Sequence, residues 1–364
     1  MTGARSDAGT DANVDVIVVG AGLSGLTATT ELVRGGWTVR CLEARSRVGG
    51  RALSVHGWVD LGATWFWNGE PTVDALLRDL GIARYDQPSA GDAVVQQADG
   101  SPMRVHGNPL DPPAYRIAGG VQRLARTLAD RLPPGTVELA TAVEAVQFTP
   151  DGAVTVHAGG RRYRAQAVVL AIPPALVVES ITFTPALPPA LSRIAASVPT
   201  WMGDTVKAVA RFDTAFWREH GLAGSAISYA GPFGEFHDHA GPEGQPALFG
   251  FAPAAAFATA SQHEVAAAFA AQLRSIWSGP PPIGLDVMDW RREAFTSPER
   301  PPPRSGLAYY GHPSLRASYA DGRLLLCSTE TAEAHAGHLE GALVAGRQAA
   351  RAVGQRLDVA VRSS

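Results

Sequence analysis

Residues 14–25 read VDVIVVGAGLSG, in which a run of β-branched residues leads into three glycines. A second strand-like run, residues 37–42, ends at Glu43. This order of strand, glycine turn, helix, strand and acid is typical of the βαβ unit that binds dinucleotides. A glycine turn in some other α/β domain is the alternative, and the common register of strand, helix and acid argues against it.

Each part of the turn has a physical task. Gly20 permits the tight turn, Gly22 lets a pyrophosphate approach the backbone, and Gly25 lets the helix pack closely on the strand. The helix is expected to begin near Leu23, so that Leu23 and Ser24 lie beside the cofactor. Free N–H groups and the positive end of the helix dipole would there favour phosphate.

The segment after the second strand indicates a larger cofactor than a nicotinamide dinucleotide. Residues 43–51 read EARSRVGGR, with three arginines and a glycine pair. Arginine donates charge-assisted hydrogen bonds to phosphate, and a solvated basic loop would not need the glycines. Glu43 is placed to bind a ribose hydroxyl. We therefore predict FAD, held here by Glu43, Ala44, Arg45, Gly49, Gly50 and Arg51.

With these residues the sequence resembles the flavin-containing amine oxidases, within the wider glutathione-reductase-like FAD superfamily. Further segments resemble the same family, namely WVDLGATWFW at 58–67, RIAGGV at 116–121, MGDTVKAVARF at 202–212 and the run 323–342. The resemblance implies that a strand, a Thr-Glu pair and a helix N-terminus near the end of the chain bracket the flavin. The further cofactor-binding residues that it implies are Leu61, Gly62, Ala63, Thr64, Val143, Ala171, Trp290, Thr329, Glu330, His338 and Leu339.

Lys207 lies in the middle of an otherwise apolar strand-like run. An ammonium group there is costly unless it finds partners. An outward-pointing lysine on an edge strand is the alternative. In the resembled family the matching lysine hydrogen-bonds a water beside flavin N5. The resemblance therefore implies that Lys207 organises this water and assists oxygen activation.

Three departures from the family pattern bear on the site. The segment 303–310, which resembles the one bearing the flavin-linking cysteine in some members, has no cysteine, so we expect non-covalent FAD. His338 stands where the family's aromatic cage has a tyrosine, and Tyr309 or Tyr310 would supply the other wall. The stretch between residues 67 and 116 is shorter than the helical insert that typically roofs the substrate cavity.

The fold class that we expect is α/β. A Rossmann-like FAD-binding domain, with a parallel sheet and a small antiparallel β-meander, would comprise residues 14–67, 116–174 and 316–357. An α+β substrate-binding domain with a mixed sheet would comprise residues 68–115 and 175–315. Residues 1–13 lack the apolar stretch of a signal peptide and are expected to form a disordered leader.

Composition excludes some classes of function. The net charge is −3 with both signs interspersed, which gives no footprint for nucleic acid. No stretch approaches the ~20 apolar residues of a membrane span. Cys41 and Cys327 lie in apolar strand-like runs, where we expect them to be buried free thiols and not a disulfide or a metal site. Free thiols are typical of a reducing compartment, so we expect a cytoplasmic protein. The HDH run at 237–239 has Gly- and Pro-rich flanks, which favours loop surface over a metal site. The sequence leaves open whether the protein forms a homodimer.

The resemblance implies oxidation of a C–H bond next to nitrogen. A neutral amine would transfer a hydride equivalent to flavin N5 and become an imine, and O2 would then reoxidise the flavin and form H2O2. Candidates for the pocket are Trp65, Trp67, Trp290, Tyr309 and Tyr310. No arginine for a carboxylate occurs in residues 61–68, so a simple amine is preferred to an amino acid. Two alternatives stay open: an FAD-dependent C–C dehydrogenase or desaturase, and a non-redox role in isomerisation or partner binding.

Overall fold

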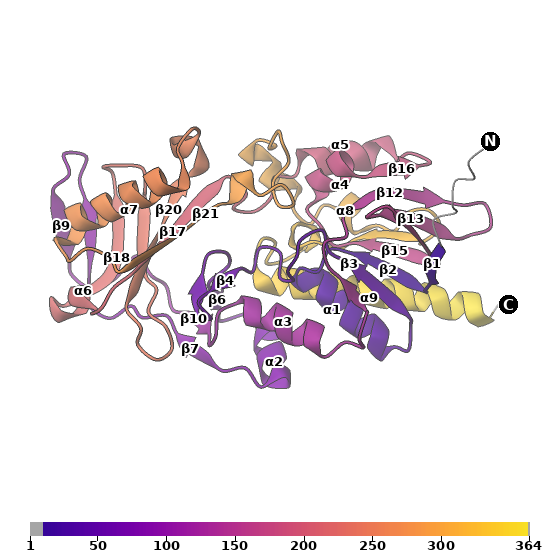
Figure 1. Ribbon diagram of the computed structural model, residues 1–364, viewed down its shortest axis with the longest axis horizontal. Coiled ribbons are helices and arrows are strands. Elements are labelled where there is room, and N and C mark those ends of the chain that lie inside the picture. Colours follow the sequence, from indigo (N-terminus) through magenta and orange to yellow (C-terminus); the bar gives the residue numbers. More distant parts are fainter. Residues whose placement is uncertain (1–9, 363–364) are drawn as a thin grey trace, which may run out of the picture. The chain divides into compact units, whose positions relative to one another are not determined.

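The computed structural model describes residues 10–362, which divide into two compact units (Figure 1). The first unit consists of the chain up to residue 50 with residues 124–201 and the chain from residue 298, and the second of residues 51–123 and 202–297. This division differs from the expected domains. Residues 51–67 and 116–123 group with the second unit, and residues 175–201 and 298–315 with the first. The assignment of FAD to particular ranges stays a prediction.

The centre of the first unit is a five-stranded parallel sheet in the order β11-β3-β2-β15-β22. Its strands are β11 (Val137–Glu138), β3 (Val39–Leu42), β2 (Val16–Val19), β15 (Ala167–Leu170) and β22 (Leu324–Leu326). The strands β2, β15 and β22 are buried throughout, as expected for a parallel sheet covered on both faces. Helices α1 (Leu23–Arg34) and α9 (Leu339–Arg362) pack against each other beside this sheet (Figure 1).

A second sheet of this unit has the order β1-β14-β13-β12-β16. Its strands are β1 (Thr10–Asn13), β14 (Arg161–Ala165), β13 (Val154–Ala158), β12 (Val143–Phe148) and β16 (Thr182–Thr184). The three strands β12, β13 and β14 are antiparallel neighbours and form the expected meander. Their inward side chains share one buried core with Ile17, Leu170 and Leu326 of the parallel sheet.

The segments 175–201 and 298–315 join the first unit because their helices cover this core. Val177, Leu191 and Leu315 are buried in it. The helices are α4 (Pro174–Ser180), α5 (Pro189–Ser197), the 3-10 helix η3 (Arg304–Tyr309) and α8 (Pro313–Arg316). The helix α3 (Gln122–Asp130) follows the glycine pair at 119–120 and passes from the second unit into the first.

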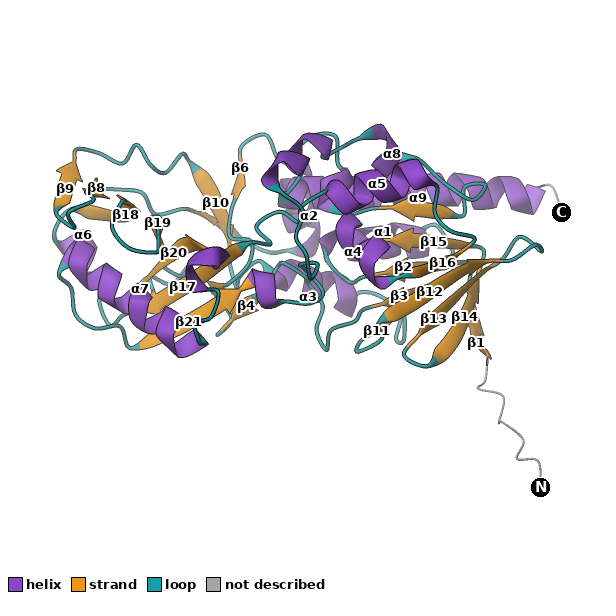
Figure 2. Cartoon of the chain, turned by 90° about the horizontal axis from the view of Figure 1, so that it is seen from above, coloured by secondary structure: helices purple, strands orange, loops and turns teal. Residues whose placement is uncertain are grey.

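The second unit is built on a seven-stranded sheet in the order β21-β17-β20-β19-β18-β8-β9, in which only β18 and β8 pair in parallel. Its strands are β21 (Gly284–Asp289), β17 (Thr205–Arg211), β20 (Ala247–Pro253), β19 (Glu235–Asp238), β18 (Leu222–Ser228), β8 (Asp92–Gln96) and β9 (Pro102–Val105). Helix α7 (Gln262–Trp277) lies along this sheet (Figure 2). Phe269 and Leu273 of α7 pack with Val206 and Ala208 of β17 on that face.

The remaining elements of the second unit are short. Two small antiparallel sheets consist of β4 (Ser54–Val55) with β5 (Val59–Asp60), and of β6 (Phe66–Trp67), β10 (Ala114–Ile117) and β7 (Arg84–Asp86). The helices are α2 (Pro71–Leu80), α6 (Phe216–Glu219), η1 (Ala254–Phe257) and η2 (Trp290–Arg292). The mixed α/β class with several sheets is as predicted.

Two expectations about the fold were wrong. Residues 10–13 are not part of a disordered leader: they form β1, which pairs in parallel with β14 and uses the free backbone groups of that edge strand. Residues 1–9 of the expected leader lie outside the described residues. The HDH run is not loop surface either, because His237 and Asp238 belong to β19, pair with β20 and are buried together with His239. Among the described helices, none combines the length and the apolar character that crossing a membrane requires.

Candidate functional site

The glycine turn lies between β2 and α1, as the sequence predicts. Gly20 has a φ of +99°, and a Cβ there would lie 2.8 Å from the carbonyl oxygen of Ala171. At Gly25 a Cβ would lie only 1.9 Å from the carbonyl oxygen of Gly20, so helix and turn touch through bare backbone. At Gly22 a Cβ would meet no atom within 4 Å. Two glycines therefore serve packing, and Gly22 leaves open space at the start of α1.

This open space lies where a helix N-terminus can receive an anion. Gly22 is the N-cap residue of α1, and no side chain caps the helix there. The first intrahelical hydrogen bond runs from Leu26 N–H to the Gly22 carbonyl, which leaves the preceding N–H groups of Leu23, Ser24 and Gly25 outside the helix ladder. Such groups, with the positive end of the helix dipole, favour a phosphate.

Glu43 ties this turn to the segment that follows β3. Its buried carboxylate accepts hydrogen bonds from the N–H of Ala21 at 2.8 Å and from the N–H of Arg45 at 2.9 Å. The guanidinium of Arg45 lies 3.4 Å from the same carboxylate. Gly49 N–H donates to the Ala21 carbonyl at 2.8 Å. The segment 43–50 is thus folded back on the glycine turn. The binding of a ribose hydroxyl by Glu43 remains a prediction.

The end of the chain supplies the last predicted part of the first unit. After β22, the 3-10 helix η4 (Thr329–Thr331) carries Glu330, which is fully buried and accepts from Trp201 N–H at 3.3 Å. The hydroxyl of Thr329 donates to the His338 carbonyl and accepts from Gly337 N–H, both at 2.9 Å. These bonds fix the loop that leads into α9 at Leu339.

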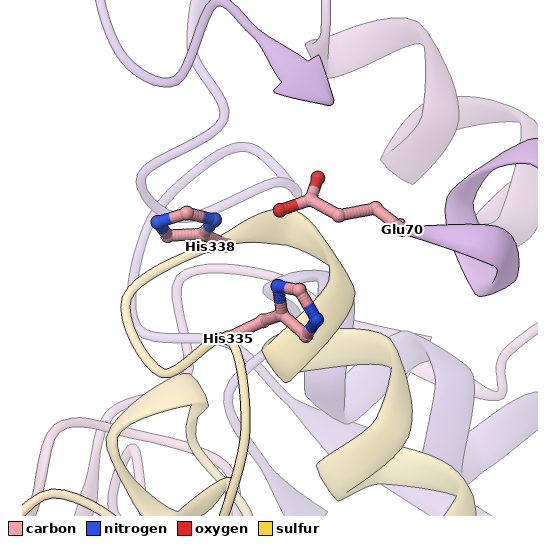
Figure 3. A group of neighbouring side chains, drawn as sticks. All are labelled: Glu70, His335 and His338. Atoms are coloured by element: carbon pink, nitrogen blue, oxygen red, sulfur yellow. The ribbon is translucent and has the colours of Figure 1, made fainter. Parts of the chain in front are cut away.

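Two histidines occupy that loop (Figure 3). The ring centroids of His335 and His338 are 6.0 Å apart, and that of His338 is 6.5 Å from Trp201. Sequence reasoning missed Trp201, although it lies only six residues before Lys207. The third residue labelled in Figure 3, Glu70, belongs to the second unit, where its carboxylate accepts from Trp67 N–H at 3.3 Å.

The two tyrosines proposed for the cage differ in surroundings. Tyr310 packs against the core of the first unit, and its hydroxyl donates to the Pro199 carbonyl at 2.7 Å. Tyr309 is exposed and its ring lies 6.2 Å from that of His312. Tyr310 thus helps to hold the core of the first unit together, and the assignment of either tyrosine to the cage stays a prediction.

Lys207 lies in β17, which has β20 on one side and β21 on the other, so it is not on an edge strand. Its side chain is 1% exposed. The ammonium donates to the Gly62 carbonyl at 3.0 Å and to the hydroxyl of Thr64. It lies 4.4 Å from the ring centre of Phe249 and 5.5 Å from that of Phe251. Burial lowers the pKa of Lys207 to about 7.

The segment Leu61–Thr64 is thus the partner of Lys207 within the second unit. Trp290 supports the same segment, because its indole N–H donates to the Leu61 carbonyl at 3.0 Å. Ala63 N–H donates to the Arg51 carbonyl at 3.1 Å. Trp290 is almost fully buried, and Trp65 donates from its indole to the side chain of Gln87 at 2.8 Å.

A buried polar group next to this segment was not predicted. Arg116 is fully buried: its guanidinium lies 3.5 Å from the Asp60 carboxylate, donates to the Ala240 carbonyl at 2.8 Å and lies 3.1 Å from His239 Nε2. The other Asp60 oxygen accepts from Ser54 at 2.6 Å and from Val121 N–H at 2.8 Å. We call Asp60, Arg116 and His239 the buried triad.

The histidine of this triad is neutral. Its Nε2 accepts from the N–H of Asp60 at 2.9 Å, so the proton lies on Nδ1. Burial, followed by the positive charges of Arg116 and Lys207, lowers the pKa of His239 well below its usual range. Burial raises the pKa of Asp60, and the charges of Arg116 and Lys207 oppose that rise.

His237 is the opposite case. Its Nδ1 lies 2.5 Å from the Asp111 carboxylate and its Nε2 lies 3.0 Å from Glu235. Burial lowers the pKa of His237, but the bonds to the two carboxylates outweigh it and the pKa is raised. The imidazole edge packs on Trp65, with ring centroids 4.9 Å apart. The Gly- and Pro-rich flanks concealed these contacts from sequence reasoning.

Comparison with known proteins agrees with the resemblance seen in the sequence. The profile of the family described as "Flavin containing amine oxidoreductase" matches residues 23–114 and 106–354. The chain therefore belongs to the flavin-containing amine oxidoreductases. It is a flavin-dependent oxidoreductase of amine-oxidase type, with FAD as its cofactor, as predicted.

Particular relatives are distant in sequence and similar over most of their length. A putative flavin-containing monoamine oxidase, AofH, of Mycobacterium tuberculosis is 28% identical, with 93% of this chain and 96% of the relative covered. The probable flavin-containing monoamine oxidase A of Dictyostelium discoideum is 23% identical over 460 residues, with 94% of this chain and 98% of the relative covered. Because this chain has 364 residues, that relative contains segments without a counterpart here.

Solved structures share the fold. Cyclohexylamine oxidase from Brevibacterium oxydans IH-35A has a TM-score of 0.83 at 21% identity, over 95% of this chain and all of that one. A wild-type putrescine oxidase bound to putrescine has a TM-score of 0.81 at 23% identity, over 93% of this chain and 98% of that one. The two segments matched by the family profile overlap at residues 106–114, inside the stretch that the sequence identifies as short.

Proposed function

We propose that this protein oxidises a simple amine to an imine and uses O2 as the electron acceptor, with FAD bound without a covalent link. Membership of the amine oxidoreductase family supports amine oxidation. The observation that carries the finer proposal is Lys207, buried in a central strand with its ammonium on Gly62 and Thr64. When bound, FAD would accept a hydride equivalent from the amine and pass the two electrons to O2, which yields H2O2.

The first unit fits a Rossmann-like dinucleotide site. The open space at Gly22, the uncapped start of α1 and the buried Glu43 carboxylate are the features that a pyrophosphate and a ribose require. In this unit the residues proposed to hold FAD are Gly20, Gly22, Leu23, Ser24, Gly25, Glu43, Ala44, Arg45, Gly49, Gly50, Val143, Ala171, Thr329, Glu330, His338 and Leu339.

Lys207 suits a reaction in which a proton is held and released near neutral pH. A lysine can lose its charge on burial, whereas an arginine stays charged. In its protonated form Nζ supports the negative charge that develops as oxygen is reduced. In its neutral form the two N–H bonds are taken up by Gly62 and Thr64, so a lone pair is free to receive a proton.

The same face of the sheet is suited to hold an amine in its neutral form. Lys207, Phe251 and Glu235 are direct neighbours across β17, β20 and β19, and Phe249 and Trp65 lie beside them. Aromatic side chains exclude water and so favour the uncharged amine, which is the form that gives up a hydride. We propose a small amine without a carboxylate, and the names of the putrescine and cyclohexylamine oxidases are consistent with that class.

The experiment that tests this function is anaerobic mixing of the FAD-loaded protein with a panel of primary and secondary amines. Bleaching of the flavin absorbance by an amine, followed by H2O2 release when O2 is admitted, is the expected result. A flavin that stays oxidised with every amine but is bleached by an alicyclic compound without an amino group would instead favour a C–C dehydrogenase.

A further inference from the structure

We propose that the buried triad of Asp60, Arg116 and His239 is a positioning group for Lys207, which holds the two acceptors of its ammonium in place and balances the buried charge around it. This inference rests on the proposed role of Lys207. Arg116 and His239 reach the triad from segments far from residues 60–64 in the sequence. None of the three side chains is exposed to solvent.

Of the 31 lysine and arginine residues of the whole chain, Lys207 is the single lysine. The other 30 of these residues are arginines, and an arginine keeps its charge even when buried. A buried cation that only had to neutralise a carboxylate could also be an arginine, as Arg116 is. The one lysine therefore stands where loss of the charge is useful.

The acceptors of Lys207, the Gly62 carbonyl and the Thr64 hydroxyl, follow Asp60 by two and four residues. Asp60 is held by four contacts: its N–H donates to His239, and its carboxylate meets Ser54, Val121 N–H and Arg116. These contacts leave the segment 60–64 little freedom. Together with the bonds from Trp290 to Leu61 and from Ala63 to Arg51, the triad therefore positions the acceptors of Lys207.

Asp60 favours the charged form of Lys207, and Arg116 disfavours it. In this unit the other charged or titratable groups on the strands beside Lys207 are His239 after β19, Glu235 and His237 on β19, and Asp286 and Asp289 on β21. Asp289 is paired with Arg291 and Arg292. Asp286 is paired with Arg211 and His56, and His237 with Asp111 and Glu235. Asp60 and Arg116 are therefore the charges left to act on the ammonium.

Because the chain has one lysine, its titration can be followed without assignment. Holoenzyme made with 13C-labelled lysine, in a chain without lysine-containing tags, gives a single Cε signal whose shift reports the charge of Nζ. We expect a midpoint near pH 7 in the wild type, since burial lowers this pKa to about 7. A wild-type midpoint at the ordinary value near 10.5 would overturn the proposal, whatever the variants show.

The decisive variant is Asp60→Asn. Loss of the negative charge should lower the midpoint of Lys207 by roughly one pH unit, because a nearby opposite charge shifts a pKa by about that much or more. General loosening of the structure would expose Lys207 and move the midpoint upward instead. The sign of the shift thus separates a charge effect from damage. An unchanged or raised midpoint in a folded Asp60→Asn protein contradicts the proposal.

Two further variants complete the experiment. Arg116→Gln should raise the midpoint, and an unchanged or lowered midpoint contradicts the proposal even if Asp60→Asn does not fold. Because loosening would also raise the midpoint, the rise supports the proposal only when urea unfolding shows Arg116→Gln to be as stable as Arg218→Gln. Arg218→Gln is the matched control. It removes a guanidinium from a buried carboxylate, Asp238, in the same sheet, and should leave the midpoint unchanged. The titration does not require amine turnover, so a failure of the proposed oxidase function would leave this result interpretable.

Discussion

Gly22 and Gly25 lie three positions apart, and we expect replacement by alanine to have different effects at the two positions: on FAD binding at Gly22 and on stability at Gly25. At Gly25 the new Cβ would lie 1.9 Å from the Gly20 carbonyl oxygen and 3.0 Å from the Ala171 side chain. Helix α1 would have to move away from the turn. Overpacking of this kind costs about 1–3 kcal/mol, which exceeds the ~1 kcal/mol that alanine gains over glycine in a helix. We expect Gly25→Ala to lower the free energy of unfolding and to weaken FAD binding.

Gly22→Ala should leave the fold intact. Its φ of −72° suits any residue, and the added methyl group would meet no protein atom within 4 Å. The free energy of unfolding of the apo-protein should change by less than about 1 kcal/mol. The methyl group would, however, occupy the space expected for the pyrophosphate. Losing one charge-assisted hydrogen bond to phosphate costs about 1.5–3 kcal/mol, which weakens FAD binding by about tenfold or more.

The assay is paired. Urea unfolding of the apo-proteins measures stability, and titration of FAD fluorescence measures affinity. The expected pattern is a stable Gly22→Ala protein with weak FAD binding, and a destabilised Gly25→Ala protein. Wild-type FAD affinity in Gly22→Ala would refute the assignment of the open space to the cofactor, and wild-type stability in Gly25→Ala would refute the packing argument.

Three further predictions concern the buried charges. Lys207→Met should slow the reoxidation of substrate-reduced protein by O2 by about tenfold or more, measured by stopped flow, with amine-driven reduction little changed; equal reoxidation rates would remove Lys207 from the reaction. Reoxidation in the wild type should fall as the pH rises through about 7, because Lys207 then loses its proton, and Lys207→Met should lack this dependence. The free energy of unfolding should rise with pH between about 7 and 10.5 in the wild type relative to Lys207→Met, since over that range the unfolded state binds a proton that the folded state does not. The same pH dependence of the free energy of unfolding in both proteins would show that folding does not lower the pKa of Lys207.

The glycine turn was predictable because all its parts lie within thirty residues and each has one physical reason. Gly20, Gly25 and Glu43 lie where that reasoning places them. The position of Lys207 was also predictable, but only through a resemblance, since its polar partners lie more than 140 residues away. No local sequence pattern predicts contacts over such a separation.

The buried triad shows what the sequence conceals. Asp60 and Arg116 are 56 residues apart, and Arg116 and His239 are 123 apart. Strand pairing brings them together, and the flanks of His239 resemble an exposed turn. The single lysine in the composition was the signal that could have drawn attention to this region. The single lysine indicates a position where a cation can lose its charge, but it does not indicate which residues surround that position.

The central claim is that the protein is an FAD-dependent amine oxidase. Its most direct test is the absorbance of the bound flavin during anaerobic mixing with simple amines, followed by admission of O2. We expect loss of the flavin absorbance with at least one amine, and its return with one H2O2 formed per flavin. A flavin that no amine bleaches, or one that is bleached but returns without H2O2, would contradict it.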